Sequence, residues 1–391
     1  MKWKTYRLGN ILQFNPAERL AKGTFAKKVP MDLLQPRTRA ISGFEMVSYT
    51  GGNKFRNGDT LMARITPCLE NGKTAYVSIL DEDEVGFGST EYIVFRNIEG
   101  VTDSKYIYYF VTNPWFRNIA IKSMVGSSGR QRVQLAVLEN LVVNLPPLAE
   151  QKRIADILGA LDDKIELNRR INDNLEEQAK ALFKSWFVDN NGEKWRKGIV
   201  SDFYDISIGK TPPRKESQWF TDSENGIVWA SISDMGSCNV FLGNSSEYLT
   251  KEAVRKFKVC VVPENTILLS FKLTIGRVAI ADKEMATNEA IAHFIAPNNA
   301  IEYTYLALKN YEFSSLGSTS SIATAINSKI IKSMPWMMPD EDTLNLFHQI
   351  VLPVFERMRN NCQEIICLSS LRDTLLPKLM SGEISVEEVS L

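Results

Sequence analysis

The sequence predicts a mixed α/β (α+β) fold: a pseudo-two-fold tandem repeat in which two globular modules are joined by two long antiparallel coiled-coil helices. Three observations predict it. Matched landmarks recur at one interval, because Trp3 and Trp195 lie 195 − 3 = 192 residues apart and Pro147 and Pro339 are separated equally. Each half begins with short apolar runs bounded by Gly, Asn and Asp, which is typical of strands and turns. Each half ends in a long segment with apolar residues at spacings of three and four, which is typical of a coiled coil.

The composition fits two separate hydrophobic cores. The chain has 391 residues, of which 44% are hydrophobic. Its 46 basic and 46 acidic residues cancel, so any nucleic-acid contact must come from local patches. The five cysteines form no CxxC pair, which favours a reducing compartment and argues against a zinc site. The chain shows no signal-like N-terminus and no apolar run of roughly 18 residues, so we expect a cytoplasmic protein without membrane contact.

The first module, residues 1–147, is expected to consist of strands and one helix. The runs GDTLMARI, GKTAYVSIL and TEYIVFR predict strands. A helix is expected from about Ser104 to Ile121, where aromatic and aliphatic residues recur every three or four positions.

The second module, residues 191–339, repeats this order. Thr266 matches Thr60, and Glu289 matches Glu91. The interval widens between these landmarks and then returns to its starting value, so the loops differ in length on a shared framework. Such loops are where selectivity is expected.

The segments 148–190 and 340–391 are the predicted helices, and they share one coiled-coil seam. In the first, the seam positions are Leu158, Leu161, Ile165, Asn168, Asn172, Leu175, Ala179, Leu182 and Trp186. In the second, they are Val351, Val354, Met358, Asn361, Ile365, Leu368, Arg372, Leu375 and Leu379. Isolated helices of this kind are marginal, so the two should pair, and the asparagines should fix their register. Gly159 and Pro353 predict that each helix begins with a short piece that bends into a long one.

Enzyme motifs fail on physical requirements. The fragments NGKT and IGKT end like phosphate-binding loops, but the glycine needed upstream is Pro67 in one and Tyr204 in the other. The tetrapeptide NPWF has no Gly-rich cofactor loop upstream. His293 is expected in a strand and His348 on a helix face, and no thiol accompanies either, so no catalytic residue is predicted.

The helical segments carry a family resemblance. LPPLAEQKRIADILGALDDKIELNRRINDNLEEQAKALFKSWFVD resembles the central conserved region of the specificity subunits of type I restriction-modification enzymes. LRDTLLPKLMSGEI resembles their distal conserved region, and the resemblance covers the full chain. It implies two target recognition domains, 1–147 and 191–339, with a central conserved helix at 148–190 and a C-terminal conserved helix at 340–391.

The resemblance also implies a function. It implies a non-catalytic subunit that reads a bipartite double-stranded DNA site, one part per module, and recruits two methyltransferase subunits and, in a larger complex, two restriction (translocase) subunits. S-adenosylmethionine, ATP and Mg would be bound by those partners, with no cofactor and no metal in this chain. The paired helices, about 38 Å long, would set the distance between the two halves of the DNA site. One departure is that MMPDEDTLNLFHQI lacks the Glu-Gln pair of PPLAEQKRI.

Candidate DNA-reading residues are cationic or amide side chains, which can form paired hydrogen bonds with bases, together with small hydroxyl residues. The favoured loops are 126–134 in the first module and 317–329 in the second. The candidates in the first module are Lys54, Arg56, Arg64, Thr66, Lys73, Ser127, Ser128, Arg130, Gln131 and Arg132. Those in the second are Lys210, Arg214, Lys215, Lys272, Arg277, Ser318, Thr319, Ser320 and Asn327. Each has the alternative role of an ordinary solvated polar residue.

The candidate partner-binding residues lie between the first module and its helix, in the run AEQKR: Glu150, Gln151, Lys152 and Arg153. A different class of function stays open as an alternative, a tandem-module adaptor that binds proteins and has no DNA role. The sequence does not specify which bases are read, because recognition loops vary on a common framework.

Overall fold

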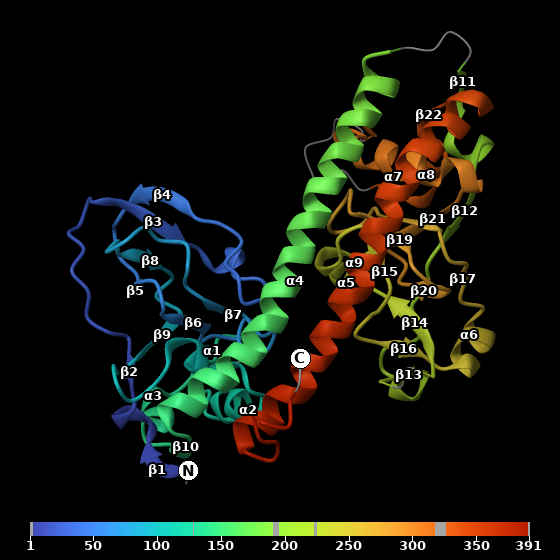
Figure 1. The fold of residues 1–391 in the computed structure, drawn as a ribbon. Helices are drawn as coiled ribbons and strands as arrows, with labels where there is room; N and C mark the ends of the chain where they lie inside the picture. The colour runs from blue at the N-terminus through green and yellow to red at the C-terminus, as the bar shows by residue number, and fades with distance from the viewer. Residues whose placement is uncertain (1–2, 128, 191–194, 223–224, 317–325, 390–391) are drawn as a thin grey trace. The chain divides into compact units, whose positions relative to one another are not determined.

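The computed structural model describes residues 3–127, 129–190, 195–222, 225–316 and 326–389 (Figure 1). The chain forms two compact units: the first comprises Met1–Glu166 and Cys367–Leu391, and the second comprises Leu167–Ile366. Both long helices, α4 (Leu148–Phe183) and α9 (Glu341–Ser381), cross from one unit into the other. The finer boundaries expected after residues 147, 190 and 339 remain predictions.

Two four-stranded sheets form the body of the first unit. The antiparallel sheet has the order β2, β9, β6, β7 (Leu12–Phe14, Tyr92–Asn97, Thr60–Ala63, Thr74–Tyr76). The mixed sheet has the order β4, β3, β8, β5 (Glu45–Ser48, Phe25–Val29, Gly86–Gly88, Lys54–Phe55). An antiparallel ribbon pairs β1 (Lys4–Arg7) with β10 (Val142–Leu145), directly before α4.

The side chains of β6 show how these layers pack. Successive residues of a strand point to opposite faces. Met62 packs into the cluster that holds Tyr106 and Ile107 of α1 (Ser104–Thr112), whereas Leu61 packs into the cluster that holds Phe55 of the mixed sheet. All four residues of β6 are therefore buried, since helices cover one face and a second sheet covers the other.

The helices of the first unit correct one expectation. The stretch predicted as one helix from Ser104 to Ile121 is two, α1 (Ser104–Thr112) and α2 (Pro114–Lys122), and a short α3 (Leu135–Glu139) follows. Pro114 lacks the amide hydrogen that a continuing helix needs but is well placed in a first turn. Asn113, with ψ 131°, ends α1, and its side chain caps α2 by accepting from the amide of Trp115 at 2.8 Å.

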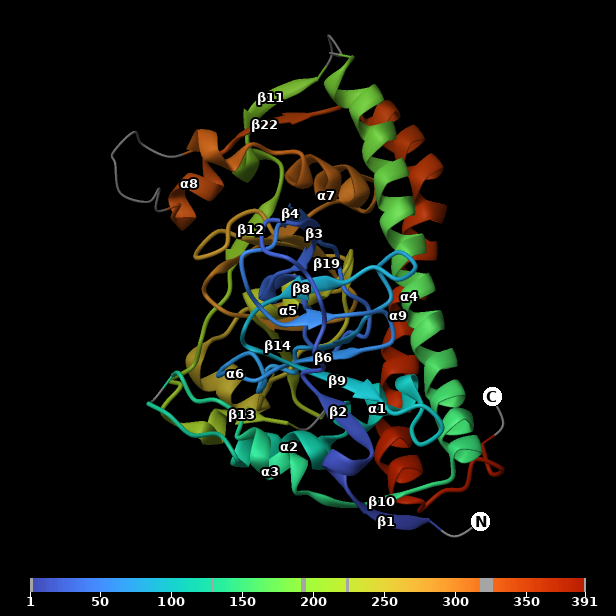
Figure 2. The same cartoon turned by 90° about the vertical axis from the view of Figure 1, so that its left-hand side faces the viewer.

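The second unit repeats this plan. One sheet has the order β12, β21, β18, β19, β15 (Asp205–Ile208, Ile291–Ile295, Ile267–Ser270, Val278–Ala281, Phe241–Leu242). The other has the order β13, β16, β14, β20, β17 (Phe220–Thr221, Tyr248–Leu249, Ile227–Ala230, Met285–Thr287, Val261–Val262). The ribbon β11 (Arg196–Ile199) and β22 (Pro335–Met338) precedes α9 (Figure 2). The order β12, β21, β18, β19 reproduces β2, β9, β6, β7, so the predicted tandem repeat is confirmed.

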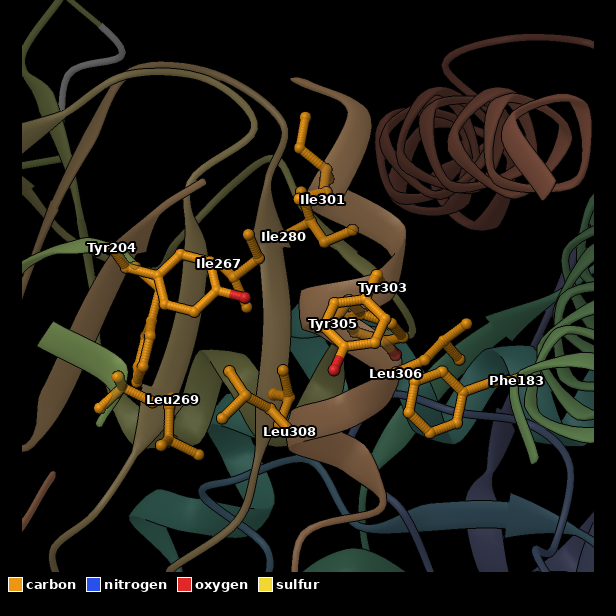
Figure 3. Close-up of a cluster of buried hydrophobic side chains, with 14 of the residues drawn as sticks. Phe183, Tyr204, Ile267, Leu269, Ile280, Ile301, Tyr303, Tyr305, Leu306 and Leu308 are labelled. Atoms are coloured by element: carbon orange, nitrogen blue, oxygen red, sulfur yellow. The ribbon is translucent and has the colours of Figure 1, made fainter. Parts of the chain in front are cut away.

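Aromatic and aliphatic residues fill the core between the sheet that begins with β12 and two helices, α7 (Ile301–Lys309) and α4. Tyr303, Tyr305 and Leu306 of α7 pack with Ile267 and Leu269 of β18 (Figure 3). Phe183 at the end of α4 belongs to the same cluster, which fastens the helix to its unit. The described part of the second unit also contains the α-helices α5 (Ile232–Ser237), α6 (Lys251–Phe257) and α8 (Ser328–Lys332).

The helices α4 and α9 pair antiparallel in each unit, as predicted. In the second unit, Asn168 of α4 contacts Glu364 of α9, and Asn172, further along α4, contacts Asn361, which comes earlier in α9. In the first unit, Ile154 and Leu158 share a cluster with Leu376 and Leu379.

The expected helix breaks do not occur. Gly159 and Pro353 lie inside uninterrupted helices. The local cost of Gly or Pro in a helix is roughly 1–3 kcal/mol, and burial of the long apolar seam outweighs it. A π-helical turn, Lys184–Val188, extends α4. Among the described residues, no helix is both long and apolar enough to cross a membrane.

Candidate nucleic-acid interface

A carboxylate lies at the centre of the candidate surface of the first unit. Arg132 clamps Glu91: its Nε lies 3.0 Å from each carboxylate oxygen and its Nη2 lies 2.6 Å from Oε1. This charge-assisted contact is the main reason why the pKa of the Glu91 carboxyl is below its ordinary value. The Arg132 side chain is still 44% exposed, so part of its guanidinium faces solvent.

Backbone pairing brings the predicted loop 126–134 together with two further candidates, Arg64 and Thr66, on one surface. The amide of Thr66 donates to the carbonyl of Gln131 at 3.1 Å, and the amide of Val133 donates to the carbonyl of Arg64 at 2.9 Å. The amide of Arg64 in turn donates to the carbonyl of Glu91 at 2.9 Å. Arg64, Thr66, Glu91, Gln131 and Arg132 are therefore neighbours, and we call them the Glu91 cluster.

The loop that carries Arg130 depends on a glycine. Gly126 has φ +137°, and a Cβ at this position would lie 2.8 Å from the carbonyl oxygen of Arg130. A larger residue would therefore push the two sides of the loop apart. Ser127 and Arg130 are exposed on this loop, and Ser128 lies outside the described residues.

The second unit has a matching carboxylate. Thr211 donates its hydroxyl to Glu289. Burial alone would raise the pKa of the Glu289 carboxyl, but the hydrogen bond from Thr211 and the nearby charges of Lys272 and Arg214 hold it below its usual value. Thr211, Arg214, Lys272 and Glu289 form what we call the Glu289 cluster.

Arg214 is held rigidly within this cluster. Its guanidinium bonds to both carboxylate oxygens of Glu247, at 2.6 and 2.9 Å. It also lies 4.4 Å from the ring centre of Trp229 and 4.6 Å from that of Phe220. Bidentate pairing and ring stacking fix a guanidinium plane in one orientation. Half of the side chain is still exposed, at 50%.

The two carboxylates occupy equivalent places in the repeat. Glu91 immediately precedes β9, and Glu289 precedes β21 by two residues. These strands hold the same place in the corresponding orders β2, β9, β6, β7 and β12, β21, β18, β19. The sequence analysis used both residues only as alignment landmarks and missed them as site residues. The available signal was an acidic residue at matched positions, in STEY and TNEA, beside loops rich in Arg and Lys.

Several predicted DNA-reading side chains make contacts within the fold and lie outside the clusters. Each of four lysine and arginine residues donates to a backbone carbonyl: Lys54 to Glu18 at 2.6 Å, Lys73 to Met31 at 2.8 Å, Lys210 to Phe257 at 2.6 Å and Arg277 to Ile232 at 2.6 Å. Arg56 donates to the carboxylate of Glu18 at 2.7 Å. Asn327 caps α8 by accepting from the amides of Lys329 and Ile330.

The remaining candidates of the second unit lie outside the Glu289 cluster or outside the described residues. Lys215 is exposed, one residue after Arg214. Ser318, Thr319 and Ser320 lie outside the described residues.

The predicted partner-binding run divides into buried and exposed residues. Gln151 has no solvent exposure: its amide donates to the carbonyls of Val101 and Pro146 at 3.1 and 2.9 Å, and its oxygen accepts from the amide of Asp103. It therefore anchors the first turn of α4 to its own module and presents no group to a partner. Glu150 accepts from Trp3 at 3.2 Å, whereas Lys152 and Arg153 are exposed.

The two histidines lie where the sequence predicted, in β21 and in α9. His293 is fully buried between the hydroxyls of Ser207 and Thr287, at 2.8 and 2.7 Å, and burial lowers its pKa to about 4. His348 lies 2.7 Å from Glu302. Within the described part of the chain, no three His, Cys, Asp or Glu residues gather as metal ligands would.

The fold and the two clusters define a tandem-repeat protein with two corresponding polar surfaces. The family model of the type I restriction modification DNA specificity domain matches this chain twice, over residues 1–177 and 192–349. The chain belongs to this family of type I restriction-modification specificity subunits.

Individual relatives span most or all of the chain. The specificity subunit of the type I restriction enzyme HindI from Haemophilus influenzae is 24% identical over 98% of this chain and 99% of its own length. The MjaIX specificity subunit of Methanocaldococcus jannaschii is 27% identical over 75% of this chain and 73% of its own. The solved S subunit of a type I restriction-modification system from M. genitalium covers 96% of both chains at 15% identity, with a TM-score of 0.48.

Proposed function

We propose that this chain specifies a bipartite double-stranded DNA site, with the Glu91 cluster reading one half and the Glu289 cluster reading the other. The observation that carries the proposal is that the same arrangement of a carboxylate and nearby cationic side chains occurs in both units. In both units, a carboxylate just before a corresponding strand, β9 or β21, lies next to the hairpin between the two following strands of the sheet order, β6–β7 or β18–β19, and has Arg or Lys nearby. Two copies of one reading surface on a single chain suit a split target.

The chemistry of the clusters supports base reading beyond simple attraction to phosphate. A guanidinium clamped on one edge by a carboxylate keeps its remaining N–H groups in a fixed plane, as bidentate recognition of guanine requires. Arg132 meets this description in the first unit and Arg214 in the second. The exposed Arg130, Lys215 and Lys272 suit phosphate contacts, which position the protein without reading sequence.

We further propose that the chain supplies no catalytic group. Adenine methylation would come from two methyltransferase subunits that bind S-adenosylmethionine, and cleavage in a larger complex would come from two restriction subunits that use ATP and Mg. The exposed Lys152 and Arg153 at the start of α4 are the proposed partner contacts. Because Gln151 is buried, this proposed surface is smaller than the sequence indicated.

Methylome sequencing tests the proposal. Cells expressing this chain with its cognate methyltransferase should carry methylated adenines in one split motif, and cells lacking the chain should not. Arg132→Ala should relax only one half of the motif and Arg214→Ala only the other, because each residue belongs to one cluster, and the unaffected half serves as the control for folding and assembly. A methylome that does not depend on this chain would refute the function and favour the protein-binding adaptor.

A further inference from the structure

An exposed leucine forms the tip of the hairpin between β18 and β19. Leu273 is 98% exposed and has φ +61°, in the left-handed region of backbone conformation. Its neighbours Lys272 and Ile275 are also exposed, with Ile275 at 39%. A leucine so completely exposed contributes nothing to the core of the unit.

The backbone at Leu273 is unfavourable for this residue type. Glycine adopts positive φ freely and asparagine tolerates it, whereas the Cβ of leucine is crowded there. Neither burial nor local conformation therefore accounts for leucine at position 273. Residues that adopt an unfavourable backbone conformation, and whose side chains do not pack in a core, occur preferentially at functional sites.

The hairpin holds this leucine in a defined position. The hydroxyl of Ser270 donates to the carbonyl of Thr274 at 2.6 Å and accepts from the amide of Arg277 at 3.0 Å. The amide of Gly276 donates to the carbonyl of Ser270 at 2.9 Å. These bonds close both ends of the loop, so the apolar tip is organised before any partner binds.

The surroundings of the tip favour a polyanionic partner. Phe271 donates its amide to the carbonyl of Ala290 at 2.9 Å, which places the hairpin beside the Glu289 cluster. Lys272 adjoins the leucine directly, and Arg214 belongs to the same cluster. An isolated apolar tip beside cationic side chains suits DNA, because the phosphates pair with the cations while the apolar group reaches the bases.

The corresponding hairpin of the first unit lacks this feature. There the loop between β6 and β7 turns its leucine, Leu69, inward, and the side chain has no solvent exposure. Of these two corresponding hairpins, both fully described, that of the second unit carries the apolar tip, which would distinguish the two half-sites.

We propose that Leu273 contacts the C5-methyl group of a thymine in the major groove of the half-site read by the second unit. This inference rests on the proposed function of DNA recognition. The major groove admits a two-stranded β-ribbon, which is the shape of the β18–β19 hairpin. The thymine methyl is the apolar group that base pairs display in that groove, so it is the natural partner of a leucine side chain.

Deoxyuridine, which lacks the methyl group, provides the test. Once methylome sequencing has given the motif, each thymine of both half-sites is replaced singly by deoxyuridine, and binding by the complete methyltransferase complex is measured. One replacement in the second half-site should weaken binding about fourfold, the value of one buried methyl group. In the complex with Leu273→Asn this difference should vanish, and in that with Leu273→Met it should persist.

The variants keep the outcome interpretable. Asparagine tolerates positive φ, so Leu273→Asn should fold at least as well as the parent chain. Leu346→Ala removes a 52% exposed leucine from α9 and should leave the thymine effect intact. The inference fails if no replacement of thymine by deoxyuridine weakens binding of the wild-type complex. It also fails if Leu273→Asn weakens binding but still distinguishes thymine from deoxyuridine, which is the result expected if the leucine inserts between base pairs. A wild-type complex that reads no split motif would instead refute the proposed function.

Discussion

The side-chain amides of Asn172 and Asn361 meet across the helix pair of the second unit, where Asn361 Nδ2 donates to Asn172 Oδ1 at 2.8 Å. Both residues are 1% exposed. Asn172 uses its own amide hydrogens on the carbonyl of Met358 at 3.2 Å and on the sulfur of Cys362 at 3.3 Å. A sliding of one helix along the other would leave these groups unpaired in an apolar seam, so the pair fixes the register of α4 against α9.

Asn172→Ala should destabilise the protein by about 1–3 kcal/mol, because it leaves the Asn361 amide buried without its acceptor. Urea unfolding of the full chain measures this loss. Leu346→Ala, an exposed position on α9, is the control and should change stability by less than about 0.5 kcal/mol. Equal effects of the two substitutions would mean that the asparagine pair contributes nothing specific.

A second polar contact joins the helices within the first unit. Arg372 donates to Asp162 at 2.6 Å, and the Tyr109 hydroxyl donates to the same carboxylate at 2.7 Å. The side chains of Arg372 and Asp162 are only 12% and 3% exposed. Arg372→Ala would leave the carboxylate buried without its charge partner, and we expect a loss of roughly 3–5 kcal/mol in unfolding free energy.

The matched control for Arg372→Ala is Asp373→Ala. Asp373 also contacts Arg372, but its side chain is 54% exposed, so its removal should cost about 0–1 kcal/mol. Thermal and urea unfolding of both variants distinguish the two cases. A small loss for Arg372→Ala would show that solvent reaches Asp162 and replaces the arginine.

Much of the fold could be predicted because it depends on long-range patterns. The repeat interval and the seam spacing persist over many residues, and single exceptions do not obscure them. The predictions of helix boundaries were wrong where they depended on a single residue. Pro353 was expected to break its helix, but it lies in an uninterrupted α9, whereas Pro114 does separate two helices because Asn113 provides a cap. In this chain, proline begins a new helix where the preceding residue caps that helix, as Asn113 does, and is otherwise accommodated within a helix, as Pro353 is.

The sequence indicated which loops belong to the candidate site, but it did not indicate which of their side chains face solvent there. Arg64 and Arg132 were expected near DNA, and the structure brings them together through backbone pairing. Arg64 itself donates to the carbonyl of Val133 at 3.3 Å, as Lys73 donates to Met31 and Arg277 to Ile232, so an internal hydrogen bond does not separate the clustered cations from the others. The pairing that brings distant loops together has no local sequence signature, so residue type alone cannot identify the members of a cluster.

Glu91→Gln should alter base preference in one half-site. The substitution removes one acceptor oxygen and the negative charge, so Arg132 loses the paired contacts of its Nε with Oε2 and its Nη2 with Oε1 that orient it. We expect discrimination at one base pair of that half-site to fall by about tenfold, within the range of a bidentate base contact. Non-specific affinity should rise slightly, because one negative charge leaves the surface.

Competition binding with single-base variants of the motif measures the effect of Glu91→Gln, and Glu247→Gln is the matched variant, because Glu247 holds Arg214 in the second unit. Its substitution should affect the other half-site. If both variants retained the wild-type preference at every position, the two carboxylates would have no part in positioning the reading side chains.

The stability of the protein should depend on pH through His293. Burial lowers the pKa of this imidazole to about 4, whereas an unfolded histidine titrates near 6.5. Between these values the unfolded chain binds the proton and the folded chain does not, so stability is lost as pH falls from about 6.5 to about 4. The unfolding free energy lost over this pH range is about 3 kcal/mol, since a tenfold difference in proton affinity between the two states corresponds to about 1.4 kcal/mol.

His293→Gln removes the titrating group but keeps a side chain that can bond to the neighbouring hydroxyls of Ser207 and Thr287. Unfolding free energies measured from pH 7 to pH 4.5 should fall less steeply for this variant than for the parent. His348→Gln is the control for the other histidine, which is paired with Glu302 outside the sheet. Identical pH slopes for His293→Gln and the parent would mean that His293 binds its proton equally in the folded and unfolded chains.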